Sequence, residues 1–360
     1  MNARRFPTTM RRMKALVLER DGALRYADVP HPRRPGPEWA LIRVAFSGIC
    51  NSDIHRGFGG GAYRYPLIMG HEFSGTIEEP AEAGRYPLGF PKGTRVTVFP
   101  LIPCRRCVPC QTGDFAQCVD YDYLGSRRDG AFAELVWAPE ANLLVVPEAL
   151  GLREASMTEP CAVALHGVGK LAIRPGDVGA VFGAGPIGNM AAQWMRLRGC
   201  PEVFIVDIDE RKLALARSMG FSPIDPREGD PAEVIRARTG GSGADRIVEA
   251  VGLPSTFLQA VQAGARFGEV VFLGNIRGRF EIGEKDFSSI LRRELTIRGT
   301  WNSRFVPEGR NEWTTVLGAL GCGIDAASLV SHTPSLAEGA DMFRRIIERK
   351  ELFNKVVFAL

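Results

Sequence analysis

The sequence predicts an α/β protein that contains a doubly wound parallel sheet. Two observations carry this prediction. Apolar strand patterns alternate with helical segments in the second half of the chain, and a glycine-rich turn, GAGPIG, joins the first of these strands to its helix. The chain has 360 residues, which is enough for two domains that each bury a core of their own.

The most specific local pattern lies between residues 178 and 207. An apolar strand (178–182) leads into a G-x-G-x-x-G turn and a helix whose apolar residues recur at i, i+3, i+4 and i+7, and a second apolar strand (203–206) ends at Asp207. The glycines let the backbone approach a pyrophosphate, which the helix N-terminus attracts. We therefore predict a dinucleotide site whose turn residues are Gly183, Gly185, Pro186, Ile187 and Gly188.

Asp207 follows the last glycine of that turn by about twenty residues, where a carboxylate can accept a hydrogen bond from a ribose 2′-OH and repel a 2′-phosphate. The sequence therefore favours NAD over NADP. Arg211 is close enough in sequence to contact the cofactor, although its place at a helix start also suits a solvated side chain. Two further strand patterns are expected to end at the cofactor crevice, unless their ends simply pack in the core. The residues expected at these ends are Val251, Leu273 and Asn275.

Four of the eight cysteines fall in one short stretch, IPCRRCVPCQTGDFAQC, with the spacing C-x2-C-x2-C-x7-C. Disulfides fit poorly, because a short loop strains Cys-x-x-Cys pairs and a reducing compartment opposes them. A ferredoxin-type iron–sulfur run would place its fourth cysteine after three residues and before a proline. Four thiolates with no open position suit a structural Zn²⁺, which holds a lobe and does no chemistry. The predicted ligands are Cys104, Cys107, Cys110 and Cys118.

A second group of metal-binding residue types is spread over two segments. A catalytic zinc needs about three protein ligands and one replaceable position. Cys50, His71 and one carboxylate, Glu72 or Glu159, would supply this set, and Gly70 lets the backbone turn tightly before the histidine. The alternative is a buried cysteine and a hydrogen-bonded histidine without metal, and the residues alone leave both open.

Composition and charge narrow the choice of partners. Hydrophobic residues make up 45% and charged residues 24% of the chain, and the net charge is only +4, so nothing beyond the basic start MNARRFPTTMRRMK favours a nucleic acid. No apolar run reaches membrane-spanning length, and the start lacks the apolar core of a secretory signal. We expect a disordered tail there rather than a transit peptide. The cytoplasm is the expected location, where thiols stay reduced.

From Lys14 onward the chain resembles the zinc-dependent medium-chain alcohol and polyol dehydrogenases. The segments LGFPKGTRVTVF, GDVGAVFGAGPIG and NKVVFAL carry the resemblance. It implies a GroES-like, mostly-β catalytic domain at 1–152 and 297–360 and a Rossmann NAD-binding domain at 153–296. Within the family, PLIPCRRCVPC, YDYLGSRRDGAFAEL and ILRRELTIRGTWNSRF are most similar to members that oxidise polyols and polyol phosphates.

The resemblance also implies which residues hold the catalytic zinc. The family's ligands correspond to Cys50, His71 and Glu159, and Glu72 is a ligand in some polyol-oxidising relatives. Asp53 corresponds to a residue that can orient the histidine.

The implied reaction oxidises a secondary alcohol of a polyol or polyol phosphate to a ketone. Zinc lowers the pKa of the hydroxyl, Ser52 accepts its proton, His55 passes the proton to solvent, and NAD receives the hydride. Relatives are commonly dimers or tetramers, so a homo-oligomer is expected. The alternatives are an amino alcohol, a cyclic polyol or a threonine-like substrate on the same fold, or a non-catalytic zinc- and nucleotide-binding member.

Two adjacent arginines raise the question of a substrate phosphate. Arg127 and Arg128 lie in GSRRDG, close in sequence to the cysteine lobe, and two guanidinium groups can clamp a phosphate. The simpler interpretation, which we favour from sequence, is a solvated turn whose arginines pair with Asp122 or Asp129.

Overall fold

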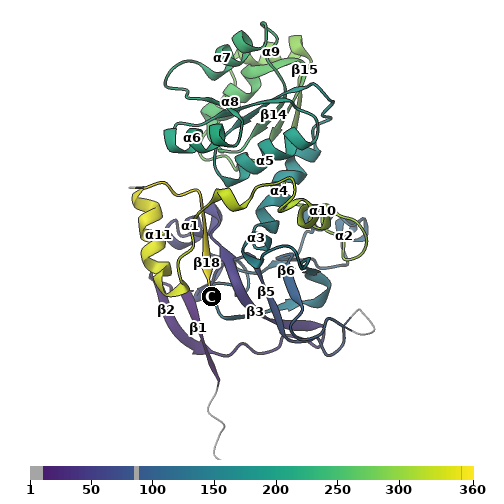
Figure 1. Cartoon of the computed structure of the whole chain (residues 1–360), viewed down its shortest axis with the longest axis vertical. Coiled ribbons are helices and arrows are strands. Elements are labelled where there is room, and N and C mark those ends of the chain that lie inside the picture. The colour runs from purple at the N-terminus through teal and green to yellow at the C-terminus, as the bar shows by residue number, and fades with distance from the viewer. Residues whose placement is uncertain (1–10, 85–88, 350) are drawn as a thin grey trace, which may run out of the picture.

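The structure is a computed structural model that describes residues 11–84, 89–349 and 351–360. The first ten residues, which include most of the basic start and its expected disordered tail, lie outside this range. Figure 1 shows two lobes stacked along the long axis, with a helix-covered sheet in the upper lobe and a β-rich lower lobe. In the described part of the chain, no helix is both long enough and apolar enough to span a bilayer.

The upper lobe is built on a parallel sheet, which confirms the predicted doubly wound arrangement. Its strands in the described residues are, in spatial order, β13 (Ser222–Ile224), β12 (Glu202–Val206), β11 (Val178–Phe182), β14 (Ala244–Glu249), β15 (Gly264–Phe272) and β16 (Thr296–Gly299). The connecting helices are α5 (Pro186–Leu197), α6 (Glu210–Ser218), α7 (Pro231–Arg238), α8 (Pro254–Ala263) and α9 (Glu284–Arg293). The strand order reverses between β11 and β14, and a ligand crevice forms at such a reversal, outside the carboxyl ends of the strands.

Both faces of this sheet are buried, as expected of a parallel sheet between helices. Along β11, Val181 packs into one core cluster, whereas its neighbours Ala180 and Phe182 pack into another. The continuous apolar run in the sequence therefore reflects burial on two sides.

The lower lobe contains a larger, mostly antiparallel sheet. Its strands in the described residues are β10 (Leu143–Val145), β6 (Arg95–Val98), β5 (Glu72–Glu79), β3 (Trp39–Gly48), β18 (Lys355–Ala359) and β17 (Val330–His332) in that order, with β9 (Leu135–Pro139) also paired to β3. A smaller sheet joins β2 (Leu24–Pro30), β1 (Arg12–Leu18) and β4 (Leu67–Ile68). Strand β18 brings the end of the chain beside β3, with Val357 opposite Gly48.

Short elements complete the lower lobe and its contact with the upper one. They are α1 (Asn51–Phe58), β7 (Leu101–Ile102), α2 (Val108–Gln111), β8 (Asp122–Tyr123), α3 (Leu152–Ala155), α4 (Thr158–Gly169), α10 (Glu312–Ala319) and α11 (Gly339–Glu348). Helix α4 lies where the lobes meet and contacts α5 of the upper lobe and β5 of the lower lobe (Figure 1). Strand β16 continues the parallel sheet to Gly299, slightly past the expected division at 296, and the domain division itself stays a proposal.

Candidate active site

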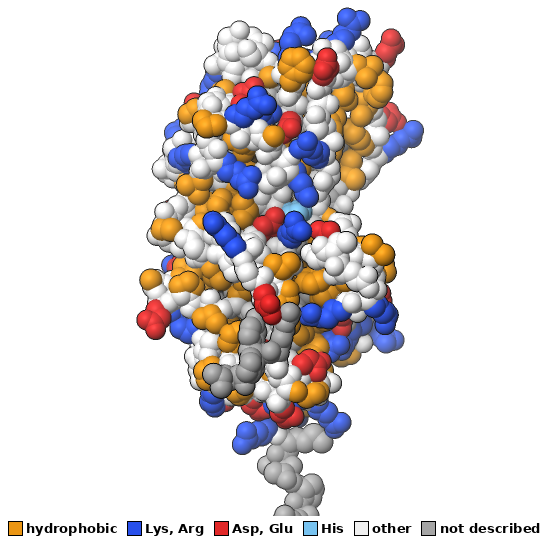
Figure 2. All heavy atoms as spheres, turned by 90° about the vertical axis from the view of Figure 1, so that its right-hand side faces the viewer, with side chains coloured by type: hydrophobic (Ala, Val, Ile, Leu, Met, Phe, Trp, Pro, Cys, Tyr) orange, Lys and Arg blue, Asp and Glu red, His pale blue; other side chains and the backbone are white. Residues whose placement is uncertain are grey.

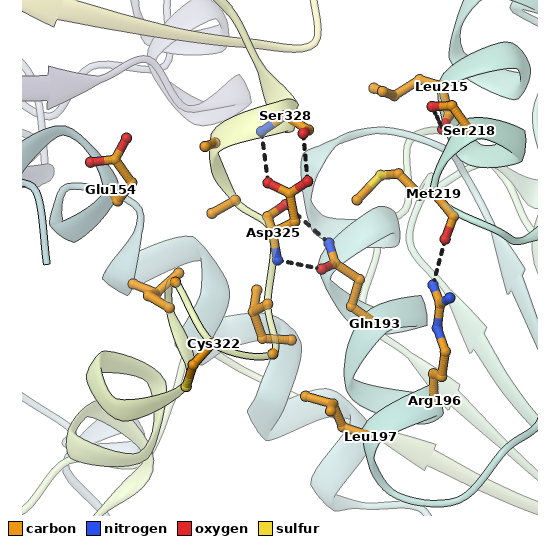
Figure 3. Close-up of a pocket in the computed structure, with 16 residues that line it drawn as sticks. Glu154, Gln193, Arg196, Leu197, Leu215, Ser218, Met219, Cys322, Asp325 and Ser328 are labelled. Atoms are coloured by element: carbon orange, nitrogen blue, oxygen red, sulfur yellow. Dashed lines mark hydrogen bonds between the residues drawn. The ribbon is translucent and has the colours of Figure 1, made fainter.

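Two hollows in the described surface differ in their chemistry. The larger, of about 640 Å³, lies beside α5 and α6 (Figure 3). Its polar groups are engaged with one another: Gln193 exchanges hydrogen bonds with the backbone of Asp325, and the carboxylate of Asp325 accepts from Ser328. The smaller hollow, of about 280 Å³, is lined by Cys50, His71 and Glu159. Size alone would select the first hollow, but the reactive side chains line the second.

Three of the predicted metal ligands come together in the lower lobe. One donor atom each from Cys50, His71 and Glu72 lies within 4.8 Å of the other two. Cys50 precedes α1 at the end of β3, and His71 and Glu72 lie at the start of β5, which pairs with β3. Gly70 has a φ of +92°, and a side chain there would meet Phe132, so the tight turn before the histidine requires glycine.

Glu159 approaches this group from α4. It lines the same hollow and accepts a hydrogen bond from the hydroxyl of Tyr123 at 3.3 Å, but it does not belong to the 4.8 Å group. Burial, together with the charge of Glu72, raises the pKa of Glu159 to about 7. The geometry brings Glu72 closer to the cysteine and the histidine than Glu159, and the role of Glu159 as a ligand stays a prediction.

Asp53 lies behind the histidine, as the resemblance implied. Its Oδ1 is 3.4 Å from Nδ1 of His71 and accepts a hydrogen bond from Arg56 at 2.9 Å, and its Oδ2 accepts from the backbone of Cys50 at 3.0 Å. Burial disfavours the imidazolium, but Asp53 and Cys50 outweigh it, so the pKa of His71 lies well above its ordinary value. The carboxylate therefore fixes both the ring and the turn that carries the cysteine.

Lys355 is a member of the site that sequence reasoning missed. Its ammonium group donates to the Glu72 carboxylate and, at 2.9 Å, to the carbonyl of Ile49. Both side chains of the ion pair are almost fully buried, with residue exposures of 3% for Lys355 and 1% for Glu72. Burial lowers the pKa of Lys355, but the charges of Glu72 and Cys50 outweigh this effect and raise it above its ordinary value. A lysine in the otherwise apolar closing strand NKVVFAL was the only local signal.

The donor set fits a catalytic zinc. A thiolate, an imidazole and a carboxylate are ligand types that zinc prefers, and two of the three residues, Cys50 and His71, border a hollow from which a fourth ligand could come. Cys50, His71 and Glu72 are therefore the residues that would hold the ion.

The four-cysteine lobe fits a second, closed zinc site. The sulfurs of Cys104 and Cys110 are 4.0 Å apart and those of Cys107 and Cys118 are 3.9 Å apart, and all four lie within 4.8 Å of one another. Tetrahedral coordination at a Zn–S distance of about 2.3 Å requires sulfurs about 3.8 Å apart. All four cysteines are free thiols, and the structure contains no disulfide between them.

Backbone groups prepare part of this lobe for metal binding. The backbone N–H of Val119 lowers the pKa of Cys107 to about 6, whereas burial and the neighbouring thiols raise the pKa of Cys110 to about 12. A cation is needed before all four sulfurs can be thiolates together.

The predicted nucleotide turn has the geometry that its glycines suggest. Gly183 has a φ of +107°, and a Cβ on Gly188 would lie 1.8 Å from the carbonyl oxygen of Gly183. Gly185 precedes α5 and faces open space, so the helix N-terminus, with Pro186 and Ile187 in its first turn, remains accessible to a pyrophosphate.

Asp207 lies at the end of β12 and is held by two backbone donors. Its Oδ2 accepts from Ala184 at 2.7 Å, and its Oδ1 accepts from Asp209 at 2.9 Å. Arg211 is engaged elsewhere, because its guanidinium forms two hydrogen bonds with the Asp209 carboxylate, at 3.1 and 2.9 Å.

The other predicted cofactor residues lie at the carboxyl ends of their strands. A Cβ on Gly183 would lie 2.8 Å from Cγ2 of Val251, which is itself partly exposed. Leu273 lines the smaller hollow, and Asn275 lies against Gly252 in the loop that follows β14. Leu273 thus links the upper lobe to the hollow of the metal group.

The two predicted relay residues lie one turn apart on α1. Ser52 lines the hollow and accepts a hydrogen bond from Arg56 at 3.0 Å, whereas His55 is exposed. No hydrogen bond joins Ser52 to His55 in the described structure, and the relay stays a prediction.

Comparison with known proteins identifies the family. Residues 186–320 match the family described as "Zinc-binding dehydrogenase", and residues 36–148 match "Alcohol dehydrogenase GroES-like domain". Galactitol 1-phosphate 5-dehydrogenase of Escherichia coli (strain K12) is 31% identical over 339 residues, which are 93% of this chain and 96% of that protein. The chain belongs to the zinc-binding alcohol dehydrogenase family. The predicted GroES-like and Rossmann fold is thereby confirmed, and the chain is an oxidoreductase with zinc and a nicotinamide cofactor.

Other zinc-binding alcohol dehydrogenases match over a similar extent. Sorbitol dehydrogenase of Halalkalibacterium halodurans is 32% identical and covers 91% of this chain and 94% of that protein. The crystal structure of galactitol-1-phosphate dehydrogenase from Escherichia coli has a TM-score of 0.89 at 30% identity and covers 97% of this chain and all of that one. A zinc-binding dehydrogenase from Sinorhizobium meliloti 1021, solved bound to NADP, has a TM-score of 0.87 at 31% identity and the same coverage.

Proposed function

We propose that this protein oxidises a secondary alcohol of a polyol, or of a polyol with an anionic end group, to a ketone, with zinc at Cys50, His71 and Glu72 and with NAD as hydride acceptor. One observation carries the proposal: Cys50 and His71 of the metal group and Leu273, at the carboxyl end of the parallel sheet, line the same hollow. A substrate held there would lie between the metal ligands and the nucleotide crevice. The relatives galactitol 1-phosphate 5-dehydrogenase and sorbitol dehydrogenase act on galactitol 1-phosphate and on sorbitol, which supports a polyol substrate.

When bound at this group, zinc supplies a Lewis acid that lowers the pKa of the alcohol. Ser52, on the wall of the hollow, is the hydroxyl to which we assign uptake of the proton, and Arg56 donates a 3.0 Å hydrogen bond to it. His55, exposed on the same helix, would pass the proton to solvent. Burial of His71 and Glu72 limits the access of water to the metal group.

Asp207 supports NAD rather than NADP. The two backbone donors hold its carboxylate at the end of β12. There the carboxylate would accept a hydrogen bond from the ribose 2′-OH of NAD and repel the 2′-phosphate of NADP. Arg211 would contribute little to binding the 2′-phosphate of NADP, because Asp209 already binds its guanidinium. The NADP complex of the Sinorhizobium meliloti relative means that this choice must be measured.

A homo-oligomer, a dimer or a tetramer, is part of the proposal. Strand β16 is the edge of the parallel sheet in the described residues, and α9, which packs against β15, has no fully buried side chain. Phe287 and Leu291 on that helix are 55% and 63% exposed, and Figure 2 shows hydrophobic side chains over the upper lobe on the face that it draws. A second copy would cover such a surface.

Two zinc ions per chain and a cytoplasmic location complete the proposal. The sulfur spacing of the four-cysteine lobe supports the second ion. All eight cysteines of the chain are free thiols, which suits a reducing compartment.

The test is a substrate panel with metal analysis. The purified protein should form NADH with one or more of a set of linear polyols, polyol phosphates, cyclic polyols and threonine, and it should prefer NAD to NADP. Cys50→Ser should abolish NADH formation while the four-cysteine lobe keeps its metal. Undiminished turnover in that variant would refute the assignment of the site.

A further inference from the structure

The hollow lined by Cys50 and His71 is also lined by a guanidinium without a carboxylate partner in the described chain. We propose that Arg127 binds an anionic end group of the substrate, a phosphate or a carboxylate, and so selects charged polyols over neutral ones. The proposal rests on the function proposed above, because the anion belongs to the same molecule whose alcohol is oxidised. Arg127 lies in the loop after β8 and lines the hollow together with Cys50 and His71.

Aromatic rings hold the Arg127 side chain in place. Its guanidinium carbon lies 3.9 Å from the ring centre of Tyr121 and 4.9 Å from that of Tyr63. One of its nitrogens, Nη1, donates to the carbonyl of Tyr121 at 2.5 Å. A guanidinium carries five N–H donors, so this contact leaves most of them available at the edges of the stacked plane. Two edge donors in a fixed plane match the oxygens of a phosphate or a carboxylate.

The charge of Arg127 is not neutralised by the protein. Within residues 11–84, 89–349 and 351–360, no carboxylate forms an ion pair with it. The other arginine that lines the hollow, Arg56, is already engaged: its Nη1 donates to Asp53 at 2.9 Å and to Ser52 at 3.0 Å. An anion entering the hollow would therefore meet Arg127 as its first unpaired cation among the described residues.

The neighbouring arginine shows the opposite arrangement. Arg128 donates from Nε to Oδ2 of Asp122 at 2.8 Å, stacks on Trp39 at 4.9 Å, and does not line the hollow. The interpretation of a turn with paired charges, favoured from sequence, thus describes Arg128 but not Arg127. This difference supplies a matched control one residue away.

The experiment compares wild type, Arg127→Gln and Arg128→Gln on three substrates of the same configuration: a hexitol, its 1-phosphate and the corresponding hexonate. Loss of a charge-assisted contact should lower the ratio of kcat/KM for the anionic substrate to that for the hexitol by about 10- to 150-fold in Arg127→Gln. Arg128→Gln should keep the wild-type ratio. The anionic substrate whose ratio falls identifies the group, phosphate or carboxylate.

Several outcomes would overturn the proposal. In the first, wild type uses the neutral hexitol with the same kcat/KM as both anionic substrates. In the second, Arg127→Gln keeps the wild-type ratio of kcat/KM values. In the third, that ratio falls equally in Arg127→Gln and Arg128→Gln. If Arg127→Gln lowers the melting temperature, Arg127→Lys replaces it, and a smaller fall in the ratio is expected because one cation remains without the planar pair of donors.

A binding measurement separates this proposal from the proposed function. If wild type forms no NADH with any substrate, the function is refuted, and calorimetric titration with the hexitol 1-phosphate and the hexonate then decides the role of Arg127. Binding of either anion at least tenfold weaker in Arg127→Gln than in Arg128→Gln supports the anion site. Equal affinities of the two variants for both compounds, or no binding to wild type, overturn it.

Discussion

Removal of the Lys355 ammonium should destabilise the protein because it leaves the Glu72 carboxylate buried without a cation. Breaking a buried ion pair by removing one partner costs about 3–5 kcal/mol. Here both side chains are almost fully buried, and Lys355→Met also removes the donor to the Ile49 carbonyl, so we expect a loss within that range. Methionine keeps most of the apolar contacts of the lysine stem, so the change is confined to the charge and the hydrogen bonds of the ammonium group.

The pair is measured by a double-mutant cycle. Glu72→Gln, Lys355→Met and the double variant are unfolded in urea with a zinc chelator present, so that metal does not contribute. Because the double variant buries no unpaired charge, the coupling energy should reach at least about 2 kcal/mol. Lys14→Met is the control, since Lys14 forms an ion pair with Asp28 at the surface and should hardly change the urea midpoint. Single losses that simply add in the double variant would refute the reasoning.

Three further predictions concern the cysteine lobe, the cofactor and pH. Cys107→Ser should reduce the zinc content from about two ions per chain to about one and lower the melting temperature, because three thiolates do not complete a tetrahedral shell. Metal analysis that still finds two ions per chain would contradict zinc binding by the four cysteines. Asp207→Ala should raise the preference for NADP over NAD by about tenfold or more, since the 2′-OH acceptor and its repulsion are both lost, and a wild type that already prefers NADP would show that the aspartate has another role. Burial raises the pKa of Glu249 above its ordinary value, so this carboxyl binds more protons in the folded state than in the unfolded state. The stability that it contributes is present below its unfolded pKa. That stability is lost as pH rises from the unfolded pKa through the folded pKa. The stability of wild type should therefore fall relative to Glu249→Gln as pH rises through that window, and parallel urea midpoints would exclude this.

The nucleotide half was predictable because its determinants are local. A strand, a turn and a helix follow one another within about thirty residues, and the spacing encodes a steric need for glycine at two positions: Gly183 has a positive φ, and a side chain on Gly188 would meet the Gly183 carbonyl. The four-cysteine lobe was predictable for the same reason, since its sulfurs come from one short stretch. In both cases neighbours in sequence are neighbours in space.

The missed residues of the active site come from segments distant in sequence. Lys355 reaches Glu72 only because β18 pairs with β3, and Tyr123 reaches Glu159 only because β8 and α4 border one hollow. Arg127 and Arg128 are identical in type and adjacent, so only the path of the loop separates the side chain that lines the hollow from the one that pairs with Asp122. Such differences depend on tertiary packing, which no local pattern contains.

The charges around the metal group explain why a divalent ion suits it. Three carboxylates lie there, and two of them have a cation in the protein: Asp53 pairs with Arg56, and Glu72 pairs with Lys355. Glu159 forms no ion pair with a lysine or an arginine of the described chain, and burial, together with the charge of Glu72, raises its pKa to about 7.

A dication held by Cys50, His71 and Glu72 would place positive charge near Glu159. It would then hold Glu159 ionised near neutral pH, so that this carboxylate could accept a hydrogen bond from a substrate hydroxyl as well as from Tyr123. The protein's own cations therefore pair with Asp53 and Glu72, whereas the nearby zinc would favour the ionised form of Glu159, which lines the hollow.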